Sequence, residues 1–127
     1  MTASRYVIDS SVWLSYFLSP DVDIAGIIDS PENTLFTSAV SLLEVKRRLI
    51  RLKKGGSQIQ AALEFMLANS LIVDADCDLC LDAADICVAD GLHTVDAMIY
   101  ACAKKTGSTL ATGDRDFEGL ADVELIE

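Results

Sequence analysis

Four carboxylates stand where an ionised side chain is costly: the end of an apolar strand, a long helix, an apolar helical segment and a Gly-containing turn. They are Asp9, Glu44, Asp96 and Asp114. Burying an unpaired charge costs more free energy than the net stability of one domain can offset. The four acids therefore predict a cation nearby, and a divalent metal ion can serve them together.

These acids offer oxygen ligands, which select Mg²⁺ or Mn²⁺ over zinc. The only histidine, His93, has no second histidine to complete a zinc set. With one or two such ions bound, a coordinated water can attack phosphorus in line while the metal stabilises the developing charge. We assign Asp9, Asp96 and Asp114 to coordination, directly or through water, and Glu44 to coordination or to holding the attacking water.

Each acid also has an ordinary structural interpretation, which the sequence alone leaves open. Asp9 can be only the N-cap of the next helix, and Asp96 can be a first-turn acid favoured by the helix dipole. Glu44 can pair with Arg48 on a solvated helix face. Asp114 suits a turn for local reasons.

The charge is unevenly distributed. The net charge is −10, yet residues 46–54 carry six of the ten basic side chains and no acid, so this stretch is +6 and the rest of the chain −16. We predict that Arg47, Arg48 and Arg51, one or two turns beyond Glu44, hold phosphates next to the metal. A basic footprint of this kind is typical of nucleic-acid binding.

The four cysteines have three interpretations. Cys77 and Cys80 have zinc-knuckle spacing, and a disulfide is the second reading. On a helix, however, the thiols share one face with apolar residues, opposite a row of aspartates. The members of the apolar face are Cys77, Cys80, Leu81, Ala84, Cys87 and Val88. This pattern favours small apolar thiols buried in the core.

Short apolar segments alternate with amphipathic ones. Strands are expected at 6–8, 35–37, 71–73 and 109–111, with a fifth at 123–125. Helices are expected at 10–18, 21–29 and 39–54. A capping box of Ser57 and Gln60 begins the next helix, Asp76 caps a helix that ends by residue 91, and Thr94 caps the last helix, at 95–105. This alternation predicts an α/β fold whose central parallel sheet of four to five strands is covered by helices on both faces.

Ligands of such sheets gather beyond the carboxyl ends of the strands, where the strand order switches. Asp9 and Asp114 each follow a strand directly, so both are expected at that crevice. Thr112 can hydrogen-bond a carboxylate there.

Length and composition set the remaining expectations. The chain has 127 residues, enough for one packed domain over 1–127. Its longest apolar run, 97–103, falls short of the ~20 residues of a membrane span, and its start lacks the layout of a signal peptide. We therefore expect a cytoplasmic protein outside the membrane.

Four segments together resemble the PIN domain, and in length and layout they are most similar to the VapC-type toxin ribonucleases. The segments are Val7–Ser11, Ser41–Val45, Val95–Ile99 and Leu110–Phe117. The order and spacing of the segments carry the resemblance, which spans nearly the whole chain.

The resemblance implies a three-layer PIN-like fold and a metal-dependent endoribonuclease. Its acids would be Asp9, Glu44, Asp96 and Asp114, with Asp116 as a further metal ligand and with Ser10 and Thr112 beside them. It also implies Mg²⁺ or Mn²⁺, an RNA substrate, a homodimer, and a cognate antitoxin that inserts a segment into the active-site groove.

Three other functions stay open. PIN domains also process RNA outside toxin-antitoxin pairs. A phosphohydrolase acting on a small molecule could use the same acids but would leave the clustered arginines without a role. A non-catalytic module whose acidic groove binds a basic peptide would suit the charge of −16 on the chain outside residues 46–54. Chelator-sensitive RNA cleavage separates the nuclease from the last two.

Overall fold

The computed structural model describes residues 4–126 and contains a five-stranded, all-parallel sheet in the order β3-β2-β1-β4-β5. The strands are β1 (Arg5–Ile8), β2 (Thr34–Ser38), β3 (Leu71–Val73), β4 (Thr109–Thr112) and β5 (Val123–Leu125). The helices are α1 (Ser10–Leu18), α2 (Val22–Ile28), α3 (Ala39–Arg51), α4 (Gly56–Asn69), α5 (Cys77–Asp90) and α6 (Thr94–Thr106), with a 3₁₀ turn, η1, at Arg115–Phe117. The predicted α/β fold is confirmed.

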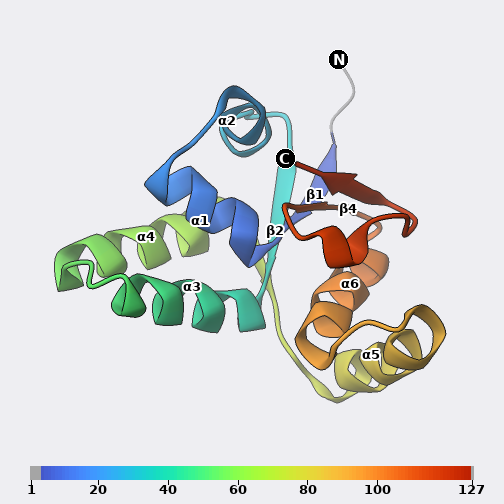
Figure 1. The fold of residues 1–127 in the computed structure, drawn as a ribbon. Helices are drawn as coiled ribbons and strands as arrows, with labels where there is room; N and C mark the ends of the chain where they lie inside the picture. Colours follow the sequence, from blue (N-terminus) through green and yellow to red (C-terminus); the bar gives the residue numbers. More distant parts are fainter. Residues whose placement is uncertain (1–3, 127) are drawn as a thin grey trace.

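Helices cover both faces of the sheet (Figure 1). Neighbouring residues of one strand point to opposite faces, so Val7 packs into a core formed with α5 and α6, while Ile8 packs into a core formed with α1 to α4. Leu110 and Ala111 divide in the same way. Because both faces are covered, the strands are apolar without alternation, as expected for a parallel sheet.

The strand order switches direction at β1. From β1 the chain builds outward through β2 and β3, then returns to place β4 on the other side of β1. The carboxyl ends of β1 and β4 therefore flank the switch point, where parallel sheets form their ligand crevice. Asp9 follows β1 directly, and Asp114 comes two residues after β4.

Two helix starts differ from the prediction. Gly55 is the N-cap of α4, and the side chain of Gln58 accepts a hydrogen bond from its backbone N–H at 3.3 Å. Ser57 is therefore inside the helix. His93, rather than Thr94, is the N-cap of α6. A capping pattern shifted by one or two residues fits the same hydrophobic periodicity.

The predicted core face of α5 is wrong for all its members but Cys87, which is half-buried against the core. The fourth cysteine, Cys102 on α6, is buried as predicted. The helix buries Leu79, Ala83 and Ile86 against α6, whereas Leu81 and Val88 are 68% and 89% exposed. Cys77 and Cys80 are also exposed, and all four cysteines are free thiols. Helix α5 is apolar on two faces, and only the face with Leu79, Ala83 and Ile86 packs against α6.

Within residues 4–126, no single helix is long and apolar enough to cross a membrane. Only α5 and α6 taken together reach that length and hydropathy, and the pair is bent by 110° at the break between them.

Candidate active site

Asp9 is fixed at the end of β1 by three hydrogen bonds. Its carboxylate accepts from the Ser10 backbone N–H at 2.8 Å, from the Ser11 hydroxyl at 3.3 Å and from the Thr112 hydroxyl at 2.7 Å. The side chain is only 4% exposed. Asp9 is thus the N-cap of α1, as one interpretation predicted, and at the same time a buried acid at the switch point.

Thr112 joins this acid to the turn after β4. Its hydroxyl donates to Asp9 and accepts from the backbone N–H of Asp114 at 3.0 Å. Asp114 in turn accepts from the backbone N–H of Asp116 at 2.9 Å. These hydrogen bonds orient the two strand-end acids relative to each other through one buried side chain.

The turn after β4 contacts the start of α1 through Gly113. Its backbone N–H donates to the Ser11 hydroxyl at 3.0 Å, and a Cβ atom at this position would lie 3.4 Å from the backbone oxygen of Ile126. Ser11 therefore bridges Asp9 and the turn. This bridging role of Ser11 depends on the pairing of β1 with β4.

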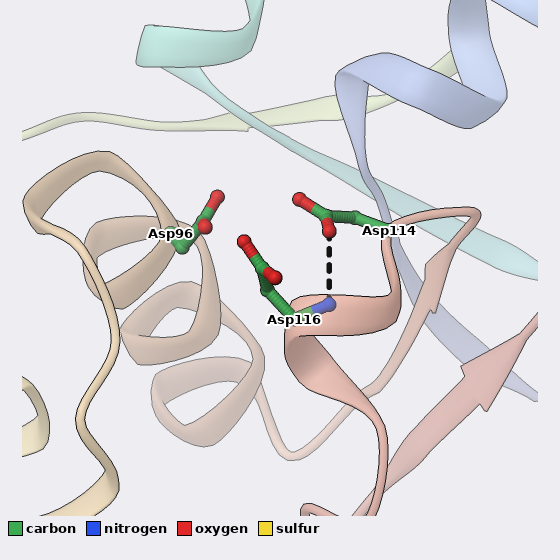
Figure 2. Close-up of side chains that lie close together, drawn as sticks. All are labelled: Asp96, Asp114 and Asp116. Carbon is green, nitrogen blue, oxygen red and sulfur yellow. Dashed lines mark hydrogen bonds between the residues drawn. The ribbon is translucent and has the colours of Figure 1, made fainter.

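Asp96 reaches the cluster from the first turn of α6. Carboxylate oxygens of Asp96, Asp114 and Asp116 all lie within 4.8 Å of one another. Figure 2 shows the three side chains converging, one from α6 and two from the turn after β4. Asp96 is half-buried, not fully buried as its apolar surroundings in the sequence suggested.

Glu44 faces the cluster from α3. It is half-buried, and its carboxylate accepts from the Ser10 hydroxyl at 3.1 Å. Burial raises the pKa of Glu44, and the nearby charges of Asp9 and Asp114 raise it further, while the Ser10 hydrogen bond and the charge of Arg47 lower it. Glu44 is therefore close enough to the strand-end acids to be affected by their charge.

Electrostatic repulsion connects all five acids. The pKa of Asp96 is raised to about 6, first by burial and then by the charges of Asp114, Asp9, Asp116 and Glu44. The pKa of Asp9 is also raised by burial, an effect that its hydrogen bonds from Thr112, Ser10 and Ser11 oppose and the charge of Asp114 increases. Of the four predicted acids, Asp96 and Asp114 therefore lie together with Asp116. Asp9 and Glu44 lie outside that close group and interact with it through their charges.

The ion pairs found in the described part of the chain do not include the acids of this cluster. Between residues 4 and 126, the two ion pairs are Lys105–Asp76 and Arg115–Glu118, both exposed and outside the cluster. Several carboxylates that repel one another in a partly buried place favour a bound cation. The donor set consists of oxygen atoms, with no thiolate or imidazole, so it fits Mg²⁺ or Mn²⁺.

The basic residues lie on the exposed side of α3. Arg47, Arg48 and Arg51 are all exposed. Arg47 is near enough to Glu44 to lower its pKa, while no hydrogen bond or ion pair within the described chain joins Arg48 or Arg51 to the acids. The predicted pair of Glu44 with Arg48 is therefore not formed.

The model of the PIN domain matches residues 6–123, so this chain belongs to the PIN domain family. No curated protein matches the sequence.

Solved structures share the fold. A chain of a toxin-antitoxin complex from Klebsiella pneumoniae is 20% identical, with a TM-score of 0.76 over 94% of this chain and 95% of that one. VapC20 of Mycobacterium tuberculosis, a sarcin-ricin loop cleaving toxin, is 23% identical, with a TM-score of 0.76 over 96% and 99%. A chain of VapBC2 from Rickettsia felis, bound to a promoter DNA fragment, is 17% identical, with a TM-score of 0.78 over 97% and 99%.

The raised pKa of Asp96 predicts how stability depends on pH without metal. Asp96 titrates near 6 in the folded chain against an ordinary value of 3.8, so folding favours its protonated form. The contribution of the protonated Asp96 to folding stability is lost as the pH rises through about 6. Asp96→Asn should therefore be more stable than the native chain at pH 7, by on the order of 1 kcal/mol after allowing for solvent screening, and less so at pH 5.

Thermal unfolding in EDTA at the two pH values measures this difference. Asp23→Asn, which removes an exposed acid on α2 outside the cluster, is the control. Added Mn²⁺ should raise the Tm of the native chain more than that of Asp96→Asn. If the Tm of Asp96→Asn and that of the native chain depended on pH in the same way, the raised pKa of Asp96 would be contradicted.

Proposed function

We propose that this chain is a cytoplasmic, single-domain, divalent-metal-dependent endoribonuclease and the toxin of a toxin-antitoxin pair. The observation that carries the proposal is that Asp96, Asp114 and Asp116 converge on one place, with Asp9 and Glu44 near enough for their charges to act there. Neither of the ion pairs found among residues 4–126, Lys105–Asp76 and Arg115–Glu118, includes one of these acids. Membership of the PIN domain family supports the nuclease assignment. Structural similarity to VapC20 and to chains of toxin-antitoxin complexes supports the toxin assignment.

In this proposal Asp9, Asp96 and Asp114 would hold Mg²⁺ or Mn²⁺, with Asp116 as a further ligand. When bound, the metal supplies Lewis acidity at the phosphodiester and makes water a stronger nucleophile at neutral pH. Thr112 keeps Asp9 and Asp114 oriented by hydrogen-bonding both residues.

Glu44 would hold and deprotonate the attacking water. Its raised pKa makes its carboxylate a better proton acceptor than an ordinary exposed glutamate. The Ser10 hydroxyl fixes one carboxylate oxygen and leaves the other available. Ser10 would therefore act by positioning Glu44.

Arg47, Arg48 and Arg51 would contact the RNA backbone. They lie on the exposed side of the same helix that carries Glu44, so phosphates bound along α3 would extend from the acidic site. Guanidinium groups bind phosphate oxygens through paired hydrogen bonds. These contacts would offset the repulsion between RNA and the negatively charged rest of the chain.

We further propose two protein partners. One is a second copy of the chain in a homodimer. The other is a cognate antitoxin that inserts a segment into the acidic groove and blocks it. The antitoxin partner is supported by the similar chains from Klebsiella pneumoniae and Rickettsia felis, whose structures are described as a toxin-antitoxin complex and as VapBC2 bound to promoter DNA.

The acid cluster predicts the effect of removing one ligand. Asp96→Asn or Asp114→Asn should lower the Mn²⁺-dependent cleavage rate of a structured RNA by roughly 100-fold or more, because each removes a charged ligand without removing the side chain's volume. Cleavage is measured on purified protein with Mn²⁺ and with EDTA. Circular dichroism checks that the variants are folded, and Asp23→Asn serves as the matched control. Cleavage that persists in EDTA, or in Asp96→Asn, would refute the proposal.

The basic side of α3 predicts a salt effect. Arg48→Ala combined with Arg51→Ala should weaken RNA binding. It should also reduce the slope of log K against log salt by about 1 to 2, because binding with fewer phosphate contacts releases fewer counterions. Binding is measured by fluorescence anisotropy on the Asp96→Asn background in EDTA. Lys104→Ala with Lys105→Ala, at the far end of α6, is the control. An unchanged slope would mean that the RNA binds away from Arg48 and Arg51.

A further inference from the structure

The first turn of α5 carries two exposed thiols. Cys77 is the first residue of the helix, and Cys80 lies three residues further on. Both thiols are free and exposed, whereas Cys87 is half-buried and Cys102 on α6 is buried. The acidic site uses neither Cys77 nor Cys80, so the two thiols are available for chemistry of their own.

The two thiols lie on the same side of the helix start. Residues three apart in a helix are neighbours, with Cβ atoms about 5 to 6 Å apart. The Cys80 thiol donates to the backbone oxygen of Ala75 at 4.0 Å, so its sulfur lies back along the helix, toward the turn that carries Cys77. A disulfide needs Cβ atoms about 3.5 to 4.5 Å apart. A bond between the two sulfurs therefore requires this turn to tighten by about 1 Å.

The start of α5 can make this adjustment because few hydrogen bonds hold it. Cys77 is at the first helical position, where the backbone N–H has no partner within the helix. The Cys80 backbone N–H donates to the Asp76 backbone oxygen at 3.1 Å, and the Leu79 backbone N–H donates to the Asp76 carboxylate at 2.9 Å. Asp76 also pairs with Lys105 of α6 at 3.6 Å, where both side chains are about half exposed. Helix ends fray more readily than helix interiors, so the turn can tighten while the rest of α5 stays packed on α6.

A bound metal does not account for the two thiols. Zinc in a structural site takes four protein ligands. Among residues 4–126, the group of three His, Cys, Asp or Glu side chains close enough to share an ion is Asp96, Asp114 and Asp116. Cys77 and Cys80 form no such group with a third side chain of the described chain. Two exposed thiols without further ligands favour thiol–disulfide exchange.

We propose that Cys77 and Cys80 form a reversible intramolecular disulfide by exchange with a small-molecule disulfide such as oxidised glutathione. One cysteine, as its thiolate, attacks a sulfur of the oxidant, forms a mixed disulfide and releases one glutathione thiolate. The other cysteine then attacks the protein sulfur of the mixed disulfide and releases the second glutathione thiolate. The two cysteines are oxidised, the oxidant is reduced to two thiols, and these take up the two protons that the cysteines give up.

Distance and burial exclude the other two cysteines from this reaction. Cys87 follows Cys80 by seven residues, which is about 10 Å along the helix axis, and Cys102 is 0% exposed. An exposed disulfide is easily reduced. The pair would therefore stay a dithiol where glutathione is mostly reduced, and it would close when the oxidised form accumulates.

The intact mass of the folded chain after incubation with oxidised glutathione tests the proposal. The native chain should lose the mass of two hydrogen atoms, and thiol titration in denaturant should then find two thiols instead of four. Dithiothreitol should reverse both changes. Cys77→Ser and Cys80→Ser should each keep a glutathione adduct, because no second thiol is within reach to release it. Cys87→Ser, the matched control on the same helix, should behave like the native chain.

Several results would overturn the proposal. A native chain that keeps all four thiols, or that holds a stable glutathione adduct, would show that the two sulfurs cannot meet in the folded chain. Loss of two hydrogen atoms that persists in Cys77→Ser or Cys80→Ser would assign the disulfide to other cysteines. Disulfide-linked dimers on a non-reducing gel, in place of the intramolecular bond, would also contradict it. The reactions are run in EDTA without RNA, so their outcome is separate from that of the nuclease proposal.

Discussion

Repulsion among carboxylates is the constraint on which the arrangement around β1 and β4 depends. The sheet brings Asp9 and Asp114 to adjacent strand ends, and α3 and α6 then add Glu44 and Asp96. The hydrogen bonds from Thr112, Ser10 and Ser11 stabilise the ionised form of Asp9 but do not cancel the effect of burial. A folded chain that keeps such a cluster gains stability from any small divalent cation that binds it.

The same hydrogen bonds explain why the site can be rigid before a ligand binds. Thr112 contacts Asp9 and Asp114, Ser11 contacts Asp9 and Gly113, and Ser10 contacts Glu44. Each of these side chains comes from the end of β4 or the start of α1, the two segments that the parallel pairing of β1 and β4 holds together. Preorganised ligands of this kind need little rearrangement to bind a metal.

Much of this could be predicted from the sequence. The short apolar strands and the acids that directly follow them fixed the sheet and two of the site residues, because carboxyl ends of parallel strands meet at one edge. Asp96 was conspicuous as an acid in an otherwise apolar segment. The contact between Ser11 and Gly113 was not predicted, since it depends on the pairing of strands that lie about 100 residues apart in the chain.

Helix α5 shows where hydrophobic periodicity fails. Its cysteine face and its Leu79 face are both apolar, and only the tertiary contact with α6 decides which is buried. Residues that a single-chain interpretation places in the core are then left at the surface.

The central claim is that a small divalent cation binds where Asp96, Asp114 and Asp116 converge, next to Asp9. Anomalous diffraction from a crystal soaked in Mn²⁺ tests it most directly. The account predicts an anomalous peak within coordination distance of these carboxylates. The absence of a peak there, with the acids instead bound by lysine or arginine side chains or the metal at Cys77 and Cys80, would contradict it.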